Sequence, residues 1–202
     1  MPIEARQDLA QRVEQVIGAL QRSEGARCAA CSASLCGHQV LLSMVLGYQD
    51  QPHCLDCLAT ALGRDRQILR DEMEAYILGK ECLSYGWRWT NLRETGKTQV
   101  KPACLWGSGI REEPPLDRGV SGPASVMKEV EGVSAEWDAG DLGCGELVLE
   151  LRTRMVALGP GQILKLAARD PGAPEDLPAW CGMTGHALLQ ARHPDYWIRR
   201  RS

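Results

Sequence analysis

Residues 140–161 read GDLGCGELVLELRTRMVALGPG, and this stretch decides the fold of the last third of the chain. A glycine-rich turn leads into apolar residues at helical spacing, which mark one packed face: Leu147, Val148, Leu151, Met155 and Leu158. Gly159-Pro160-Gly161 ends this helix. One strand is expected around Trp137, before the turn, and another at 162–168, after the helix.

The pattern continues with a second helix and two more strands. A turn over 170–178 leads into a short helix through Trp180 and Cys181, and strands are expected at 186–191 and 196–200. The order is therefore βαβαββ. It predicts an α+β fold in which one mixed sheet carries two helices on one face, a two-layer sandwich.

The same residues resemble the TusA-like (SirA-like) sulfur carrier family over nearly all of 135–201. The matching segments are Asp141-Leu-Gly-Cys144, Gly161-x-Ile-Leu-Lys-Leu, Asp170-Pro171, Asp176-Leu-Pro178-Ala-Trp-Cys181 and Gly185-His186-x-Leu188-Leu189. Family members hold sulfane sulfur as a persulfide on a cysteine at the start of the first helix. The resemblance implies that Cys144 is the catalytic residue, supplied by a cysteine desulfurase or a rhodanese-type donor and discharged to an acceptor protein.

Elementary chemistry agrees with such a role for Cys144. The first turn of a helix offers unpaired N–H groups and the positive end of the dipole, which stabilise a thiolate or a persulfide anion. The family's cysteine is usually followed by proline, in a Cys-Pro-x-Pro motif, whereas this chain has Gly145 and then Glu146. An alternative is therefore a non-enzymatic interaction or regulatory protein that uses the carrier fold without sulfur transfer.

Two Cys-x-x-Cys pairs, Cys28-Ala-Ala-Cys31 and Cys54-Leu-Asp-Cys57, dominate the first half. Each pair can hold one side of a tetrahedral ion, so Cys28, Cys31, Cys54 and Cys57 are the predicted ligands of a structural zinc. Iron in place of zinc, a redox dithiol and reduced core cysteines stay open. Whether a further nearby group replaces one cysteine also stays open; the candidates are Cys36, His38 and His53.

A helix over residues 6–21, a β-hairpin over 39–51 and a helix running from 58 to 79 are expected in this half. A zinc knuckle, a hairpin and a helix with the last two ligands resemble a treble-clef zinc finger. The predicted organisation is a mostly helical zinc-binding domain (1–90), a proline- and glycine-rich linker (91–134) and the carrier domain (135–202).

Composition narrows the class of protein and of partner. The 202 residues are 44% hydrophobic and 24% charged with a net charge of −3, which excludes a strongly basic surface of the kind that coats nucleic acid. No apolar run suits a membrane span or a signal peptide, so a cytoplasmic protein with reduced thiols and protein partners is expected.

Three of the nine cysteines have not yet been assigned a role: Cys82, Cys104 and Cys181. Cys82 and Cys181 are expected to be packed core residues. Cys104 falls in the expected linker, as an idle thiol or as a relay to Cys144. A third hypothesis is a thiol redox or metal-delivery protein that uses Cys104, Cys144 or Cys181, and it predicts more than one metal per chain.

Overall fold

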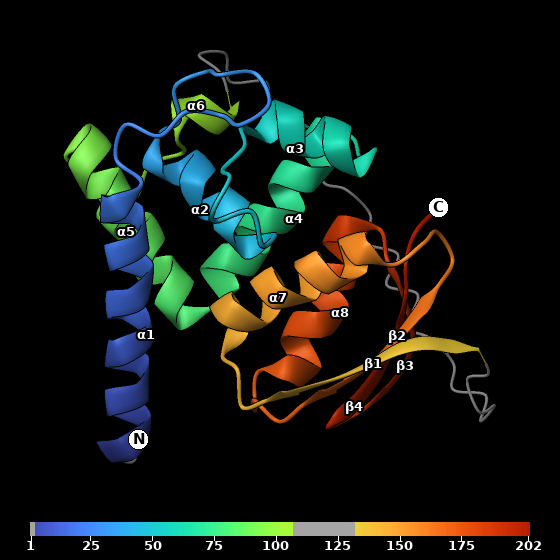
Figure 1. The fold of residues 1–202 in the computed structure, drawn as a ribbon. Coiled ribbons are helices and arrows are strands. Elements are labelled where there is room, and N and C mark those ends of the chain that lie inside the picture. Colours follow the sequence, from blue (N-terminus) through green and yellow to red (C-terminus); the bar gives the residue numbers. More distant parts are fainter. Residues whose placement is uncertain (1–2, 107–131) are drawn as a thin grey trace.

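Two apolar cores organise the chain, one among helices and one between a sheet and two helices (Figure 1). The computed structural model describes residues 3–106 and 132–202, without the side chains of residues 3–6 and 144. Among the helices of these two ranges, none is long and apolar enough to cross a bilayer.

The C-terminal half confirms the predicted α+β sandwich. Its elements are β1 (Val133–Gly140), α7 (Cys144–Ala157), β2 (Ile163–Ala168), α8 (Ala173–Thr184), β3 (Ala187–Arg192) and β4 (Asp195–Arg199). The strand order is β1-β2-β4-β3, with β1 parallel to β2 and the other pairs antiparallel. Helices α7 and α8 cover one face of this sheet (Figure 1).

The N-terminal half is helical, as expected. Its elements are α1 (Ile3–Arg22), α2 (Gly37–Val45), α3 (Leu55–Leu62), α4 (Arg66–Gly79), α5 (Glu81–Thr95) and α6 (Ala103–Trp106). Leu41, Leu55 and Leu58 are fully buried at the centre of this half. Its core therefore lies among helices and away from the sheet.

The predicted hairpin over 39–51 is wrong, because most of that segment is the helix α2. Short apolar runs in a strand and in a fully buried helix look alike in sequence. Helix α2 is buried on almost every side, and the buried side chains are His38, Val40, Leu41, Leu42, Ser43 and Val45. The treble-clef resemblance therefore holds for the knuckle and the final helix only.

Two element boundaries also differ from expectation. The helix predicted from 58 to 79 is interrupted by Gly63, with a φ of 59°, and restarts at α4, where Asp65 accepts the N–H groups of Gln67 and Ile68. Helix α5 continues to Thr95 and α6 follows at 103–106, so these parts of the expected linker are folded onto the helical half. The remainder, 107–131, lies outside the described residues.

The two halves pack against each other along α4 and α8. Tyr76 donates a hydrogen bond of 2.8 Å to Asp176, and the Lys80 ammonium lies 2.9 Å from the same carboxylate. The Lys80 ammonium also pairs with Glu175 at 2.6 Å. Met183 of α8 belongs to the helical core rather than to the core of its own half. The C-terminal half is therefore docked and not merely tethered.

Each half supplies an arginine to the end of a helix in the other half. Arg64 donates to the carbonyl of Gly182 near the end of α8, and Arg201 donates to the carbonyls of Ala61 and Leu62 at the end of α3. Carbonyls in a last helical turn lack partners within the helix, and a cation there also complements the dipole. These reciprocal contacts fix the two halves at a second place.

Gly47 provides a test of how closely the halves approach. It has a φ of +81°, and a Cβ on it would lie 2.6 Å from the carbonyl oxygen of Val148 in α7. Gly63 also has a positive φ, 59°, but has open space around it. Both Gly→Ala variants place an alanine in the left-handed backbone region, which costs free energy. Only Gly47→Ala adds a collision with the other half.

We expect Gly47→Ala to lower the free energy of unfolding by about 1–3 kcal/mol more than Gly63→Ala, as measured by urea denaturation. Equal losses in the two variants would contradict the close approach of Gly47 to α7.

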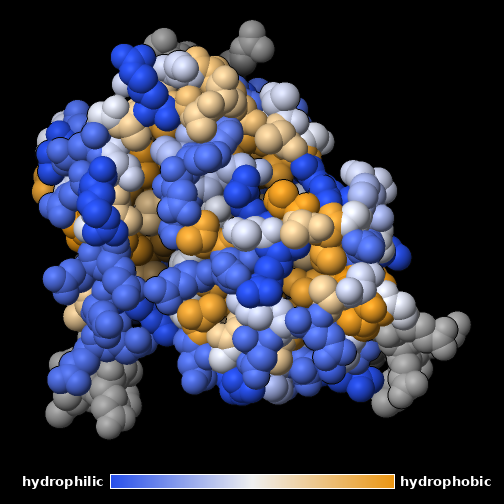
Figure 2. All heavy atoms as spheres, in the orientation of Figure 1, coloured by the Kyte–Doolittle hydropathy of each residue, from blue (hydrophilic) through white to orange (hydrophobic). Residues whose placement is uncertain are grey.

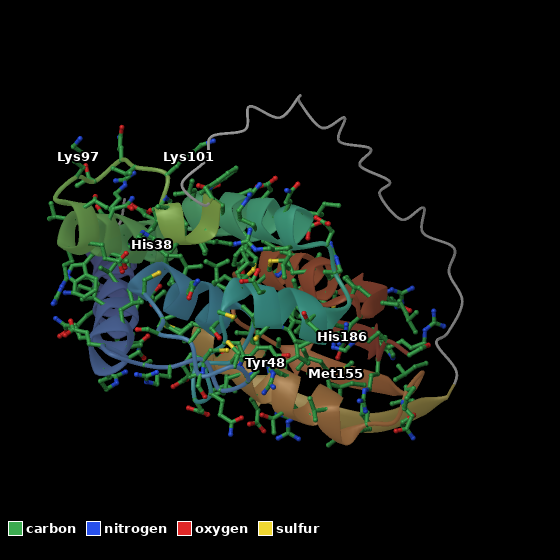
Figure 3. All side chains as sticks on the ribbon, turned by 90° about the horizontal axis from the view of Figure 1, so that it is seen from above. His38, Tyr48, Lys97, Lys101, Met155 and His186 are labelled. Atoms are coloured by element: carbon green, nitrogen blue, oxygen red, sulfur yellow. The ribbon has the colours of Figure 1, made fainter. Side chains whose placement is uncertain are left out.

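His186 provides a pH test at the same boundary, where it lines a small cavity of about 80 Å³ together with Tyr48 and Met155 (Figure 3). Burial, helped by the charges of Arg201 and Arg200, lowers the pKa of His186 to about 4. The unfolded chain takes up this proton near pH 6.5. Its contribution to stability is therefore complete above about pH 7 and is lost as the pH falls toward 4.

Between pH 7 and pH 5 the wild type should lose roughly 1–2 kcal/mol of unfolding free energy that His186→Gln does not lose. Denaturation curves of both proteins at the two pH values measure this difference. The same pH dependence of the unfolding free energy in the two proteins would contradict a lowered pKa of His186.

Candidate functional site

The backbone of Cys144 begins α7. Gly143 is the N-cap, with φ −69° and ψ 163°, and its carbonyl accepts the N–H of Leu147 at 2.8 Å. The first N–H groups of a helix have no acceptor within the helix, and a glycine N-cap has no side chain to supply one. The start of α7 is therefore a place where backbone donors are available to an anion.

An open cleft of about 400 Å³ adjoins this helix start, and its lining includes Gly143 and Gly145 on either side of Cys144 in sequence. Most of the opposite wall comes from α1, including Gln11, Gln15 and Arg22. The outer surface of α1 is hydrophilic (Figure 2). The helical half thus forms one wall of the cleft beside the backbone of Cys144.

Charged groups line the cleft with both signs. Arg12 of α1 lies 3.2 Å from Asp8 and 3.3 Å from the buried Asp170 of the C-terminal half. Asp141 and Glu146 are exposed close to the start of α7. These two carboxylates can pair with a positive group on an incoming molecule. They also disfavour the binding of an anion close to them.

The four cysteines of the two Cys-x-x-Cys pairs come together in the structure. Their sulfur atoms lie within 4.8 Å of one another, and Cys31 Sγ lies 3.8 Å from Cys54 Sγ. Cys28 and Cys54 are buried, whereas Cys31 is exposed. Cys54 is the N-cap of α3, so Cys57 falls in its first turn. The predicted ligand set of Cys28, Cys31, Cys54 and Cys57 is therefore one cluster.

Local backbone structure holds this cluster. The N–H of Ser32 donates to the carbonyl of Cys28 at 2.8 Å, and Ser32 has a φ of 61°, which forms the tight turn of the first pair. The N–H of Ala29 donates to the carbonyl of Pro52 at 2.9 Å and joins the two pairs. The N–H of Cys54 points at the sulfur of Cys28, 3.3 Å away.

The cluster fits a tetrahedral metal ion. Zinc–sulfur bonds of about 2.3 Å place tetrahedral sulfurs about 3.8 Å apart, the separation of Cys31 and Cys54. Burial raises the pKa of Cys28, but N–H groups led by that of Cys54 outweigh it and bring the pKa to about 6. Hydrogen bonding to Cys54, together with burial, raises the pKa of Cys57. Four thiolates therefore need a cation among them, and the cluster could hold one.

The other candidates from the sequence fall elsewhere. His53 Nδ1 lies 2.6 Å from the carbonyl of Gln51, and His53 is not in the four-cysteine group. Cys82 and Cys181 are buried in the two cores, as expected, and burial raises the pKa of Cys181 to about 12. Neither of these two thiols joins a metal-type cluster among the described residues.

A second polar group was not predicted from the sequence. Cys36, His38, Glu94 and Cys104 bring their ligand atoms within 4.8 Å of one another. The spacing Cys36-x-His38 was the available signal, but Cys104 follows His38 by 66 residues and only the fold joins them. Cys104 lies in α6 beside His38, and a relay from Cys104 to Cys144, whose side chain lies outside the described residues, stays a prediction.

Loss of one ligand tests the four-cysteine cluster. Cys57→Ser should reduce the metal bound at this cluster from about one ion per chain to about none, because one bond to a tetrahedral ion is removed. Elemental analysis of the dialysed protein measures the change. Cys181→Ala removes a thiol outside both groups and serves as the control. Equal metal contents in all three proteins would contradict the ligand assignment.

Comparison with known proteins bears on the C-terminal half. The family described as "Sulfurtransferase TusA" matches residues 135–200. The sulfur carrier protein TusA of Pseudomonas putida (strain W619) is 39% identical over 69 residues, which are 32% of this chain and 86% of the relative. The sulfur carrier protein TusA of Pseudomonas paraeruginosa (strain DSM 24068 / PA7) is 36% identical over 74 residues, which are 35% of this chain and 94% of the relative.

The matched segment runs from β1 through β4 and contains the start of α7. It covers most of each relative, and the resemblance seen in the sequence motifs is confirmed. Through residues 135–200, this chain belongs to the TusA family of sulfur carriers.

Proposed function

We propose that this protein carries sulfane sulfur as a persulfide on Cys144 and relays it from a donor protein to an acceptor protein, while a zinc ion in the four-cysteine cluster stabilises the helical half. The observation that carries the proposal is the position of Cys144 as the first residue of α7, next to the cleft. The family of the carrier half, to which this residue belongs, supports the same chemistry.

The proposed transfer is an exchange between thiols. The thiolate of Cys144 attacks the outer sulfur of a donor persulfide, the bond between the two donor sulfurs breaks, and the donor cysteine leaves as a thiolate. No net oxidation occurs, and the persulfide now resides on Cys144. The positive end of α7 and its first N–H groups favour the anionic forms on which both directions of the exchange depend.

Gly145 and Glu146 shape this reaction. Gly145 has open space around it and leaves one more N–H group free than the proline usual in the family, at the expense of a preset backbone angle. Glu146 adds negative charge within the first turn, where it partly offsets the dipole. The helix start therefore supports a persulfide anion less strongly than a Cys-Pro start.

The helical half has a proposed role in the choice of partner. Because α1 forms most of the opposite wall of the cleft, a donor or acceptor must reach Cys144 with a narrow segment. A cysteine desulfurase or a rhodanese-type donor is the proposed source of sulfur, and the expected compartment is the cytoplasm. The four cysteines would hold zinc without an open position, so the ion would supply folding energy and leave the sulfur chemistry to Cys144.

Sulfur loading tests the proposal. Intact-protein mass spectrometry after incubation with polysulfide, or with a cysteine desulfurase and cysteine, should show a gain of one sulfur atom in the wild type. Cys144→Ala should lose at least nine-tenths of this gain because the acceptor thiol is absent. Cys181→Ala should load like the wild type, since its thiol is buried.

Two results would contradict sulfur transfer on Cys144. The first is equal loading of the wild type and Cys144→Ala. The second is no loading of a folded wild type that retains its metal, which would favour a zinc-stabilised interaction protein built on a carrier fold.

Restoring the family's proline gives a second test. Gly145 lies in the first turn of α7, where proline needs no hydrogen-bond donor and fixes a helical φ. Gly145→Pro should keep the fold and raise the rate of loading about two- to fivefold, which corresponds to roughly 0.4–1 kcal/mol of ordering. Time-resolved mass spectrometry measures the rate. A folded variant that loads more slowly would show that the glycine is needed.

A further inference from the structure

A second group of metal-type ligands is distinct from the four-cysteine cluster. Cys36 is the N-cap of α2, His38 lies in the first turn of α2, Glu94 is near the end of α5, and Cys104 is in α6. In Figure 3, His38 lies on the same side of the molecule as the loop that carries Lys97 and Lys101 and leads into α6. Three elements thus converge on one point.

The separations suit four ligands around one ion. His38 Nδ1 lies 3.1 Å from Glu94 Oε2 and 3.8 Å from Cys104 Sγ, and all four ligand atoms lie within 4.8 Å of one another. Tetrahedral zinc with bonds of about 2.0–2.3 Å places nitrogen and oxygen ligands about 3.3 Å apart and pairs that include sulfur about 3.5–3.8 Å apart.

The surroundings of His38 orient its ring toward the group. The side chain of His38 is fully buried, and its Nε2 lies 2.9 Å from Asn91 Oδ1. Asn91 donates from Nδ2 to the carbonyl of Thr98 at 3.1 Å, which fixes its oxygen toward His38. An oxygen accepts, so Nε2 carries a hydrogen, and the second ring nitrogen, Nδ1, faces Glu94 and Cys104. A metal-binding histidine is commonly held in this way.

Glu94 is held by the same element that carries the first two ligands. Its Oε1 accepts the N–H of Gly37 at 2.8 Å, which leaves Oε2 facing His38 Nδ1. A protonated ring would pair with Glu94 through a second N–H, whereas in a neutral ring Nδ1 and Oε2 are two acceptor atoms 3.1 Å apart beside two sulfurs. A bound cation resolves this arrangement, because all four groups can then donate electron pairs to it.

We propose that Cys36, His38, Glu94 and Cys104 form a second metal site that binds a zinc-type divalent ion. Two sulfur ligands and an imidazole favour a borderline-soft ion such as Zn²⁺ over Mg²⁺ or Ca²⁺. The ion ties α6 and the segment after α5 to the N-terminus of α2. The side chain of Glu94 is 34% exposed, so this site, like the four-cysteine cluster with its exposed Cys31, is partly open to solvent.

Metal content tests the proposal with the full chain. Protein produced with added zinc and dialysed against metal-free buffer should hold about two ions per chain, by elemental analysis and native mass spectrometry. The double variant Cys36→Ser/Cys104→Ser should hold about one, and the control Cys181→Ala about two. In Co²⁺-loaded protein, the sulfur-to-cobalt absorption of the double variant should be about one third weaker, since two of six thiolates are gone.

The outcomes separate the two metal sites. A content of one in the wild type and none in the double variant supports the second site and contradicts zinc in the four-cysteine cluster. Equal contents in the wild type and the double variant overturn the second site. A Cys36–Cys104 disulfide in the unreduced wild type also overturns it.

A wild-type measurement covers the case in which the double variant does not fold. Cys104 is only partly buried, so alkylation of the native holoprotein reports directly on whether its sulfur is bound to metal. Cys104 should stay unmodified while both ions are retained. Full alkylation of Cys104 without loss of metal overturns the proposal.

Discussion

Two buried carboxylates of the carrier half, Asp170 and Asp176, fix how this half packs against the helical half. Each is only 4% exposed, and a carboxylate is tolerated in such a place only with strong partners. Positively charged side chains of the helical half pair with them: Arg12 with Asp170, and Lys80 with Asp176. Because both aspartates flank or begin α8, docking of the helical half is tied to positions that also carry the family motif.

This docking determines the surroundings of the start of α7. With Arg12 held at Asp170, α1 stands opposite the glycine-rich turn before α7 and encloses the cleft from the other side. A carrier domain by itself would present the same helix start to solvent. In this chain, the cleft beside the backbone of Cys144 is also lined by residues more than one hundred positions earlier in sequence, such as Gln11 and Gln15. In the proposed function, sulfur chemistry and partner selection are thus divided between the two halves.

Sequence patterns predicted the parts of the structure that depend on local spacing. The βαβαββ order and the four cysteines of the first cluster follow from short motifs whose geometry is fixed within a few residues. Helix α2 was predicted as a hairpin because a fully buried helix has no polar face to reveal its period. Glu94 and Cys104 were missed as partners of His38 because their meeting depends on the packing of α5 and α6, which no local pattern encodes.

The contact of Arg201 with the end of α3 has a consequence for the order of assembly during translation. Arg201 follows Leu62 by 139 residues, which a ribosome adds in about 7–28 s at 5–20 residues per second. All four cysteines of the first cluster have been synthesised by residue 57, long before the arginine that completes the end of α3. The metal proposed for this cluster can therefore bind the nascent helical half first, and the carrier half then docks onto a framework that is already formed.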